Sequence, residues 1–222
     1  MKTDDASVVV HGLCRRFGRR WALSHVNLDL PQGAGVVVTG GNGSGKSTLL
    51  RCLATALRAH AGTMTMGGKA MWTHREQLRP HIGYMAHQNH LWMDLSAHEN
   101  LSAWAGLGGQ TVDAPALLEQ VGLNAGRRDA VRTFSAGMKR RLAVARMLLR
   151  TPRLLLLDEP FSGLDAAGRT DVAKLFAALR AEGTTLVVAT HLPQAVVTMV
   201  DRCVTLEEGR ITSDEPFSGL SA

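Results

Sequence analysis

The sequence has few cysteines, no long apolar run and no long basic tract. Cys14, Cys52 and Cys203 lie far apart and form no C-x-x-C pair, which argues against a disulfide framework or a zinc site and favours a reducing compartment. The longest aliphatic runs, such as residues 154–157, are far shorter than the ~20 apolar residues that a membrane-spanning helix needs. The formal net charge of +6 comes from dispersed arginines, so the composition indicates no nucleic-acid platform.

The composition is that of an ordinary globular protein. With 222 residues and 45% hydrophobic composition, the chain can fill one α/β domain or two small ones. Its first residues carry two acids and no apolar core segment, so we expect no secretory signal and a location on the cytoplasmic side of a membrane.

The order of apolar patterns predicts strands that alternate with helices. Alternation over residues 8–13 and 21–30 predicts two strands of a small antiparallel layer. Buried strands are predicted at 36–39, 154–157 and 186–190, with a helix before the last of them whose inner face is Val172, Leu175, Phe176 and Leu179. Such alternation favours a mainly parallel sheet.

We therefore expect one domain over 1–222, in which a helical segment interrupts a core. Residues 90–150 are rich in Ala and Leu and predict a helical subdomain. The core with its antiparallel layer is expected over 1–89 and 151–222.

A phosphate-binding loop follows the strand at 36–39. Residues 40–47 read GGNGSGKS, fit G-x-x-x-x-G-K-[ST], and precede leucines at helical spacing. The glycines let successive N–H groups face a phosphate, and the following helix adds its positive end. Lys46 is expected to contact the β- and γ-phosphates and Ser47 to bind Mg²⁺. The predicted ATP-binding residues of this segment are Gly40, Asn42, Gly43, Ser44, Gly45, Lys46, Ser47 and Thr48. The alternative is a glycine-rich turn that matches by chance.

Two carboxylates end the strand at 154–157. Asp158 and Glu159 follow four leucines, at the edge where ligands of open α/β sheets bind. Asp158 would bind Mg²⁺, usually through water, and Glu159 would polarise the attacking water. The alternative is a pair of solvated acids at a strand end.

Residues 134–138, FSAGM, resemble the L-S-G-G-Q signature of ABC ATPases, and this family resemblance covers nearly the whole chain. It implies a P-loop NTPase fold with a mainly parallel core sheet, an antiparallel layer and a helical subdomain. It also implies that the signature residues Ser135, Ala136 and Gly137 contact the γ-phosphate of ATP held by another protomer. Phe134, Ala136 and Met138 depart from the usual letters, but the hydroxyl and the second glycine are kept.

The resemblance assigns three further residues. Phe17 is placed like the aromatic residue that stacks on adenine, although a core position is the alternative. Asp165 in the segment SGLD resembles the D-loop at the dimer interface. His191 resembles the switch histidine that contacts the γ-phosphate, although a lone histidine at a strand end is more often structural or exposed.

The Q-loop is where the sequence departs most from the family pattern. His87 occupies the usual glutamine position, and Gln88 follows it, so either residue could serve as the Mg²⁺ ligand and His87 could act in catalysis. Histidine here resembles the ATP-binding subunit of the haem exporter used in cytochrome c maturation. The signature and the segment around Asp158 are shared with drug and ABC-2-type exporters, which leaves a drug or lipid exporter as the alternative.

The resemblance implies an ATPase that drives transport and needs partners. These are a second cassette, either another copy or another ABC ATPase, and separate membrane permease subunits on whose cytoplasmic face the chain would sit. Trp92 and Met93 could line the permease-facing groove or belong to the core. A nucleic-acid-linked ABC ATPase is the alternative of another class, but too few residues separate Lys46 from Ser135 for a coiled-coil arm. A non-transport regulator at the membrane is a third possibility.

A second copy of one motif stands near the end of the sequence. Residues 214–220 repeat 158–164, DEPFSGL, letter for letter. Because Arg210-Ile211-Thr212-Ser213 precedes it instead of four leucines, we expect this copy to lack a supporting buried strand and to be a non-functional tail.

Overall fold

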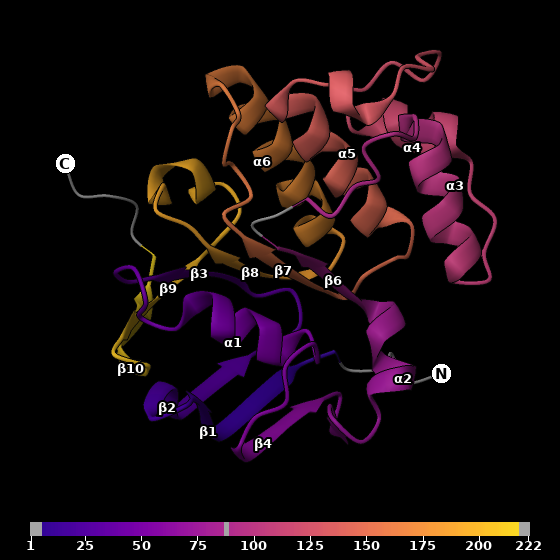
Figure 1. Ribbon diagram of the computed structural model, residues 1–222. Helices are drawn as coiled ribbons and strands as arrows, with labels where there is room; N and C mark the ends of the chain where they lie inside the picture. Colours follow the sequence, from indigo (N-terminus) through magenta and orange to yellow (C-terminus); the bar gives the residue numbers. More distant parts are fainter. Residues whose placement is uncertain (1–5, 87–88, 218–222) are drawn as a thin grey trace.

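Two sheets and a group of helices make up the computed structural model, which describes residues 6–86 and 89–217 (Figure 1). The strands are β1 (Val8–Phe17), β2 (Arg20–Leu30), β3 (Gly35–Thr39), β4 (Ala61–Met66), β5 (Lys69–Ala70), β6 (Ile82–Met85), β7 (Leu154–Asp158), β8 (Thr185–Ala189), β9 (Arg202–Glu207) and β10 (Arg210–Pro216). The helices are α1 (Lys46–Leu53), α2 (Arg75–Leu78), α3 (Ala97–Leu107), α4 (Ala114–Gln120), α5 (Ala136–Leu148) and α6 (Ala166–Ala181).

The larger sheet has six strands in the order β10-β9-β3-β8-β7-β6. Its internal pairs are parallel, and only the edge strand β10 runs antiparallel to its neighbour. The smaller sheet is antiparallel, with the order β2-β1-β4-β5. The predicted mainly parallel sheet with a small antiparallel layer is therefore confirmed.

Successive side chains of the large sheet enter two different cores, because a strand alternates faces at every residue. Val37, Leu155 and Val188 pack in the core that includes the inner faces of α3–α6. Val36 and Leu156 pack in the other core, with α1 and the antiparallel sheet. Figure 1 shows this layering, with α5 and α6 on one side of the sheet and α1 on the other.

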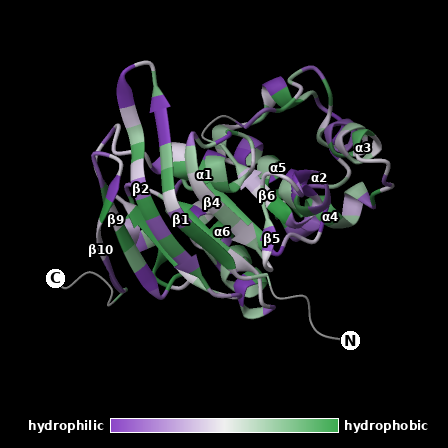
Figure 2. Ribbon diagram, turned by 90° about the horizontal axis from the view of Figure 1, so that it is seen from below, coloured by the Kyte–Doolittle hydropathy of each residue, from purple (hydrophilic) through white to green (hydrophobic). Residues whose placement is uncertain are grey.

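The β1–β2 hairpin is longer than the sequence predicts. We expected the polar segment at 15–20 to separate two strands, but Arg16 pairs with Trp21 and Phe17 with Arg20, so that only two residues turn the chain. Backbone pairing tolerates charged side chains on an exposed face, and Gly18 supplies the positive φ of 57° at the turn. The bands of green and purple along β1 and β2 in Figure 2 show the alternation of apolar and polar residues. The extension places Phe17 at the tip of the hairpin.

The segment between β6 and β7 is helical. It contains α3, α4 and α5, and α3 begins with a capping box in which Ser96 and Glu99 satisfy each other's backbone N–H groups. The boundaries of a helical subdomain at residues 90 and 150 remain a prediction. The longest helix among the described residues, α6, has 16 residues, and none of the helices described is long and apolar enough to cross a bilayer.

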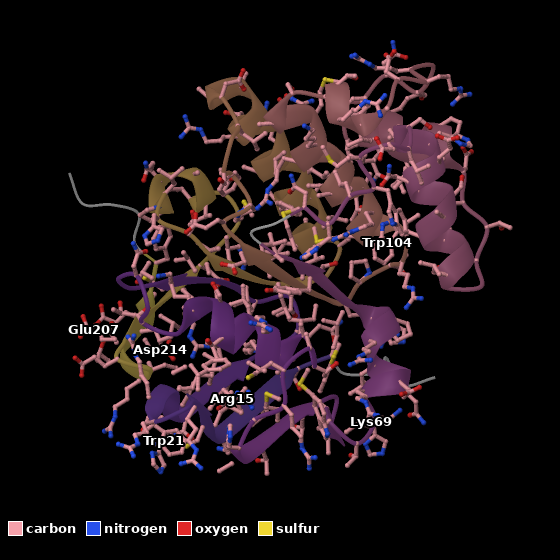
Figure 3. All side chains as sticks on the ribbon, in the orientation of Figure 1. Arg15, Trp21, Lys69, Trp104, Glu207 and Asp214 are labelled. Atoms are coloured by element: carbon pink, nitrogen blue, oxygen red, sulfur yellow. The ribbon has the colours of Figure 1, made fainter. Side chains whose placement is uncertain are left out.

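The terminal repeat lacks a buried strand before it, as expected, but its first three residues belong to the exposed edge strand β10 and are not an unstructured tail. A tight turn at Glu208 and Gly209, with φ of 47° and 78°, brings β10 against β9, where Asp214 pairs with Val204. The Asp214 carboxylate accepts two hydrogen bonds from the guanidinium of Arg202. Figure 3 shows Asp214 and Glu207 on this edge hairpin. The sequence signal that we missed is the short turn, and residues 218–222 lie outside the described residues.

Candidate nucleotide-binding site

Three loops meet at one edge of the large sheet. β3, β8 and β7 are neighbours and parallel, so the loops that follow their carboxyl ends lie together, at the edge where α/β sheets bind ligands. A cavity of about 770 Å³ opens there. Its lining residues are Phe17, Arg20, Ala22, Asn42, Gly43, Ser44, Gly45, Lys46, Ser47, Thr48, Asp158, Glu159, Ser162 and His191.

The loop at 40–45 needs glycine at defined positions. Gly40 and Gly45 have φ of 136° and 111°, which side-chain-bearing residues rarely adopt. A Cβ atom at Gly40 would lie 2.1 Å from the Leu206 carbonyl oxygen, and one at Gly45 would lie 2.3 Å from that of Ala22. The loop therefore curls tightly against neighbouring backbone before α1 begins at Lys46. The positive φ values and the close backbone contacts leave no room for a side chain at either position.

Lys46 is buried at the start of α1, and its ammonium group binds backbone carbonyl oxygens of the phosphate loop. Its Nζ donates to the carbonyl oxygens of Gly40, at 2.6 Å, and Gly41, at 2.9 Å. Burial lowers the pKa of Lys46, while the carboxylates of Glu159 and Asp158 act in the opposite direction. A negatively charged group entering the cavity would offset the cost of burying this ammonium, so the site favours anions.

The donor set fits a magnesium nucleotide. Ser47 in the first turn of α1 and Asp158 at the end of β7 line the same cavity and offer hydroxyl and carboxylate oxygens, the ligands that Mg²⁺ prefers. Asp158 is buried and Ser44 Oγ is also buried, and Ser44 Oγ makes no hydrogen bond within the described part of the chain. Ser47 and Asp158 would hold the metal, and the loop amides with Lys46 would hold the phosphates.

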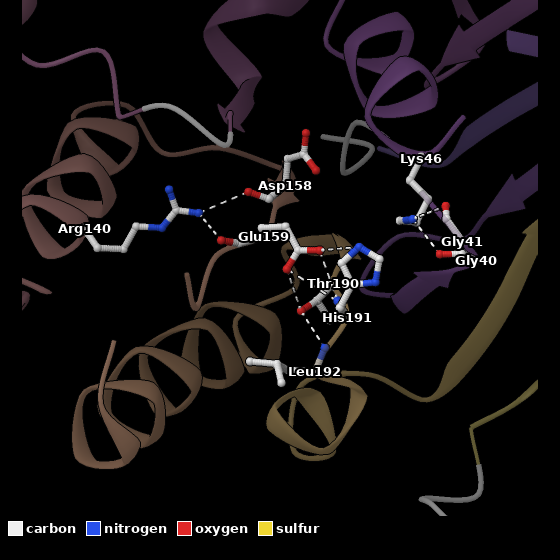
Figure 4. A network of polar contacts seen from close by, with 9 residues as sticks. All are labelled: Gly40, Gly41, Lys46, Arg140, Asp158, Glu159, Thr190, His191 and Leu192. Carbon is white, nitrogen blue, oxygen red and sulfur yellow. Dashed lines mark hydrogen bonds and ion pairs between the residues drawn. The ribbon is translucent and has the colours of Figure 1, made fainter. Parts of the chain in front are cut away.

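Glu159 has an unusual backbone and a fixed carboxylate (Figure 4). Its φ is 49°, and its N–H continues the sheet by donating to the Ala189 carbonyl oxygen at 2.8 Å. The carboxylate accepts hydrogen bonds from the Thr190 hydroxyl, at 3.2 Å, and from the His191 N–H, at 3.1 Å. These donors turn the carboxylate toward the loop after β8, so the alternative of a freely solvated acid is wrong.

His191 lies beside Glu159 at the mouth of the cavity. Its Nε2 atom is 3.6 Å from Glu159 Oε1, and its side chain is 54% exposed while that of Glu159 is 19% exposed. The imidazole can therefore reach a ligand in the cavity while its backbone N–H helps to position the carboxylate.

The rest of the cavity wall includes Phe17, Arg20 and Ser162. Sequence reasoning assigned Phe17 to the nucleotide and Ser162 to the D-loop segment, and it did not find Arg20. Phe17 is 46% exposed, so the alternative of a buried core residue is wrong. The Arg15 guanidinium covers its ring, at 4.9 Å from the centroid. Arg20 donates to the Gly43 carbonyl oxygen at 3.4 Å, which places a second cation at the phosphate loop. The hairpin register that brings Arg20 there was not readable from residue types alone.

The predicted signature residues line a separate cavity. Ser135, Ala136, Gly137 and Asp165 border a space of about 500 Å³ whose lining shares no residue with the nucleotide cavity. Ser135 caps α5 by accepting from the Met138 N–H at 3.2 Å. Asp165 caps α6 by accepting from the Gly168 N–H at 2.8 Å. The nucleotide cavity and the signature cavity are thus two separate hollows of one chain.

The remaining predicted residues lie elsewhere. His87 and Gln88 fall outside the described residues. Trp92 and Met93 are 38% and 41% exposed, so neither is a core residue. The Trp92 ring lies 4.9 Å from the ring of Trp104, a residue of α3 that is labelled in Figure 3.

The fold and the phosphate loop define a P-loop ATP-binding protein, and comparison with known proteins identifies the family. The model of the family described as ABC transporter matches residues 23–162. The lantibiotic transport ATP-binding protein SrtF of Streptococcus pyogenes is 31% identical over 95% of this chain and 91% of its own length. The cytochrome c biogenesis ATP-binding export protein CcmA of Nitrosococcus oceani is 37% identical over 82% of this chain and 84% of its own length. This chain belongs to the ABC transporter family as an ATP-binding subunit.

Solved structures agree on the fold. The dimeric ATP-binding cassette MJ0796 bound to ADP and Pi superposes with a TM-score of 0.86, over 96% of this chain and 100% of the other, at 24% identity.

Proposed function

We propose that this chain hydrolyses ATP within a head-to-tail pair of cassettes and powers export through separate membrane subunits. The observation that carries the proposal is the position of Glu159, whose carboxylate is oriented by Thr190 and His191 in the same cavity as the phosphate loop. The family membership supports ATP hydrolysis as the reaction.

The residues divide the chemistry among them. The loop amides and Lys46 bind the β- and γ-phosphates, and Phe17 stacks on the adenine. Glu159 orients a water whose oxygen attacks the γ-phosphorus, while the bond to the bridging oxygen of ADP breaks and both water protons leave on the phosphate product as dihydrogen phosphate. His191 contacts the γ-phosphate from the loop after β8. Ser47 and Asp158 would hold Mg²⁺, which would supply positive charge against the phosphates when bound.

One chain supplies only half of each working site. Ser135 and Gly137 contact the nucleotide held by a second cassette in this proposal, which is supported by the signature resemblance and by a signature cavity whose lining shares no residue with the nucleotide cavity. Asp165 lines the same cavity and would lie at the interface. The dimeric state named for the neighbouring cassette MJ0796 supports this arrangement.

A complementation experiment tests the pairing. Lys46→Ala and Ser135→Ala chains should each turn over ATP slowly when alone, because each variant damages both composite sites of its own dimer. A mixture forms heterodimers with one intact site, since an unaltered loop faces an unaltered signature. We expect the mixture to regain a substantial part of wild-type turnover. A mixture no faster than its components would contradict the head-to-tail site.

Haem for cytochrome c assembly is the substrate that we propose, with the chain at the cytoplasmic face of the inner membrane. The histidine at position 87 and the 37% identity to CcmA support it. Cells that lack this chain should lose c-type cytochromes and keep b-type ones, as haem staining and absorption spectra would measure. Purification of the tagged chain from membranes should recover the permease subunits.

A drug, lipid or peptide exporter is the second candidate, because SrtF matches over more of this chain than CcmA does. Normal c-type cytochromes, together with sensitivity to an exported compound, would favour this candidate and leave the ATPase assignment standing.

A further inference from the structure

Arg140 is a buried cation that the proposed chemistry does not use. It lies on α5, five residues after the helix cap Ser135, and is 2% exposed. Among the buried residues of α5 it shares one stripe with Ala143, Val144 and Met147, at the spacing of an apolar helix face. An arginine on such a face must find its partners inside the protein.

The contacts of Arg140 join α5 to the end of β7. Its Nε donates to the Pro160 carbonyl oxygen at 2.9 Å, and its Nη2 donates to that of Asp158 at 3.1 Å. Nη2 also donates to the Glu159 carbonyl oxygen, and Figure 4 shows the guanidinium facing this strand end. Three successive peptide groups at the proposed catalytic carboxylates are therefore bound by one side chain.

The same guanidinium also binds the segment that follows β6. Nη1 donates to the Asn89 Oδ1 atom at 2.9 Å and to the Ala86 carbonyl oxygen at 3.3 Å. The planar fork of arginine has five N–H donors, which a lysine ammonium cannot reproduce. Arg140 thus connects α5, the end of β7 and the segment after β6.

Burying this cation is costly, so its retention calls for a role beyond packing. Burial lowers the pKa of Arg140 to about 10, although the carboxylates of Asp158 and Glu159 act in the opposite direction. The side chain still carries its charge at neutral pH. Glu159 has φ of 49°, a conformation that persists only where the surroundings fix it. Ala189 fixes its N–H, and Arg140 binds its carbonyl oxygen.

We propose that Arg140 is a positioning residue that fixes the backbone of Glu159 and couples it to the signature helix. This inference rests on the proposed function of Glu159. Ser135 and Arg140 belong to one helix, so a nucleotide that contacts Ser135 from the second cassette also sets where the guanidinium lies. The side-chain carboxylate of Glu159 is then oriented only when α5 holds Arg140 against the Glu159 carbonyl oxygen.

Two substitutions at Arg140 and one matched control test the proposal. Arg140→Gln removes the fork, Arg140→Lys keeps the charge and one donor group, and Lys139→Gln removes the same charge from the same helix one residue earlier. Lys139 donates one long hydrogen bond within the described ranges, 3.4 Å to the Arg132 carbonyl oxygen. We expect Arg140→Gln to lower kcat roughly 100-fold, as a misplaced catalytic group does, with the Kd for ATP nearly unchanged. Arg140→Lys should lie between Arg140→Gln and wild type, and Lys139→Gln should match wild type.

A double variant separates positioning from a merely structural role. Because Arg140 acts through Glu159, Arg140→Gln should add almost nothing to the loss caused by Glu159→Gln in single-turnover hydrolysis. Losses that multiply, or a loss of turnover that follows the unfolded fraction seen by circular dichroism, would overturn the inference. If Glu159→Gln alone keeps full turnover, the proposed function fails. Full turnover of Arg140→Gln beside an inactive Glu159→Gln overturns only the role of Arg140.

The test remains decisive if Arg140→Gln does not fold. Asn89→Ala deletes one acceptor of the fork and leaves the arginine in place, so it should lower kcat less than Arg140→Lys does. Wild-type kcat in both Asn89→Ala and Arg140→Lys would overturn the inference.

Discussion

The two copies of DEPFSGL have the same letters and different surroundings. In the first copy, Asp158 ends a fully buried parallel strand and Glu159 has positive φ, with its carboxylate bound by Thr190 and His191. In the second copy, Asp214 and Glu215 belong to an edge strand and are exposed. Asp214 pairs with Arg202 instead of facing a phosphate loop.

The difference shows that the motif acts through its neighbours. A central strand delivers Glu159 to the carboxyl edge of the sheet, next to the loops after β3 and β8. An antiparallel edge strand runs in the opposite direction to its neighbour, so it delivers the same residues away from that edge. The letters alone therefore predict a carboxylate pair and not its chemistry.

The sharpest test compares the same substitution in both copies. Glu159→Gln should lower ATP turnover by roughly 100- to 10,000-fold, the usual contribution of a positioned carboxylate that acts on the attacking water. ATP binding should persist and the ATP-bound dimer should accumulate, because the phosphate contacts are untouched. Glu215→Gln should turn over at the wild-type rate. Phosphate release and gel filtration with ATP measure both, and equal effects in the two variants would end the distinction between the copies.

A second test removes Lys46, which lines the same cavity as the first copy of the motif. Lys46→Ala deletes a charged hydrogen-bond donor at the phosphates, so ATP should bind about 10- to 100-fold more weakly. Lys69→Ala, at an exposed position on β5, is the control and should bind ATP normally. Binding of a fluorescent ATP analogue measures the Kd. An unchanged Kd for ATP in Lys46→Ala would contradict the role of Lys46 in binding the phosphates.

Sequence reasoning found the residues whose chemistry is written in short motifs. Two short motifs carry these residues: one holds Gly40, Gly45 and Lys46, and the other holds Asp158 and Glu159. Each motif follows a clear strand pattern. Arg20 and Arg140 were missed because their partners come from elsewhere in the fold. Arg140 left a signal, since an arginine on the stripe of Ala143, Val144 and Met147 is out of place on an apolar face. The strand that contains the start of the terminal repeat was not predicted, because β10 has no buried residue and therefore no run of apolar residues in the sequence.

The third test concerns position 87, which follows β6 in the sequence. Its prediction rests on the sequence, because His87 lies outside the described residues. Imidazole can donate or accept a hydrogen bond as an amide does. We expect His87→Ala to bind ATP normally and to lose much of the stimulation by the membrane partners, whereas His87→Gln keeps most of it. ATPase assays of the cassette alone and of the purified complex with its membrane subunits measure this stimulation. Full stimulation of His87→Ala would exclude a coupling role.

The fourth test removes the second copy. Truncation after Ser213 deletes the end of β10 and Phe217, which packs against the core of α3–α6. We expect a loss of about 2 kcal/mol in the free energy of unfolding, or roughly 4–8 °C in Tm. Turnover measured well below Tm should stay near the wild-type value. Turnover lost in a truncated chain that is still folded would show that the second copy takes part in function.

The smallest expected effect is the loss of unfolding free energy when the Arg202–Asp214 ion pair is removed and strand β10 is kept. Arg202 donates to both carboxylate oxygens of Asp214 and also to the Asp29 carbonyl oxygen, and the paired side chains are 27% and 31% exposed. Asp214→Asn removes the charge and keeps the strand, so the free energy of unfolding should fall by only about 0.5–1 kcal/mol. Glu215→Gln, an exposed neighbour with the same charge change, should leave it unchanged. Because salt screens such pairs, the loss in Asp214→Asn should shrink as ionic strength rises in denaturant titrations. A loss in Asp214→Asn as large as that of the truncation would mean that the ion pair, and not the strand and Phe217, fixes this edge of the sheet.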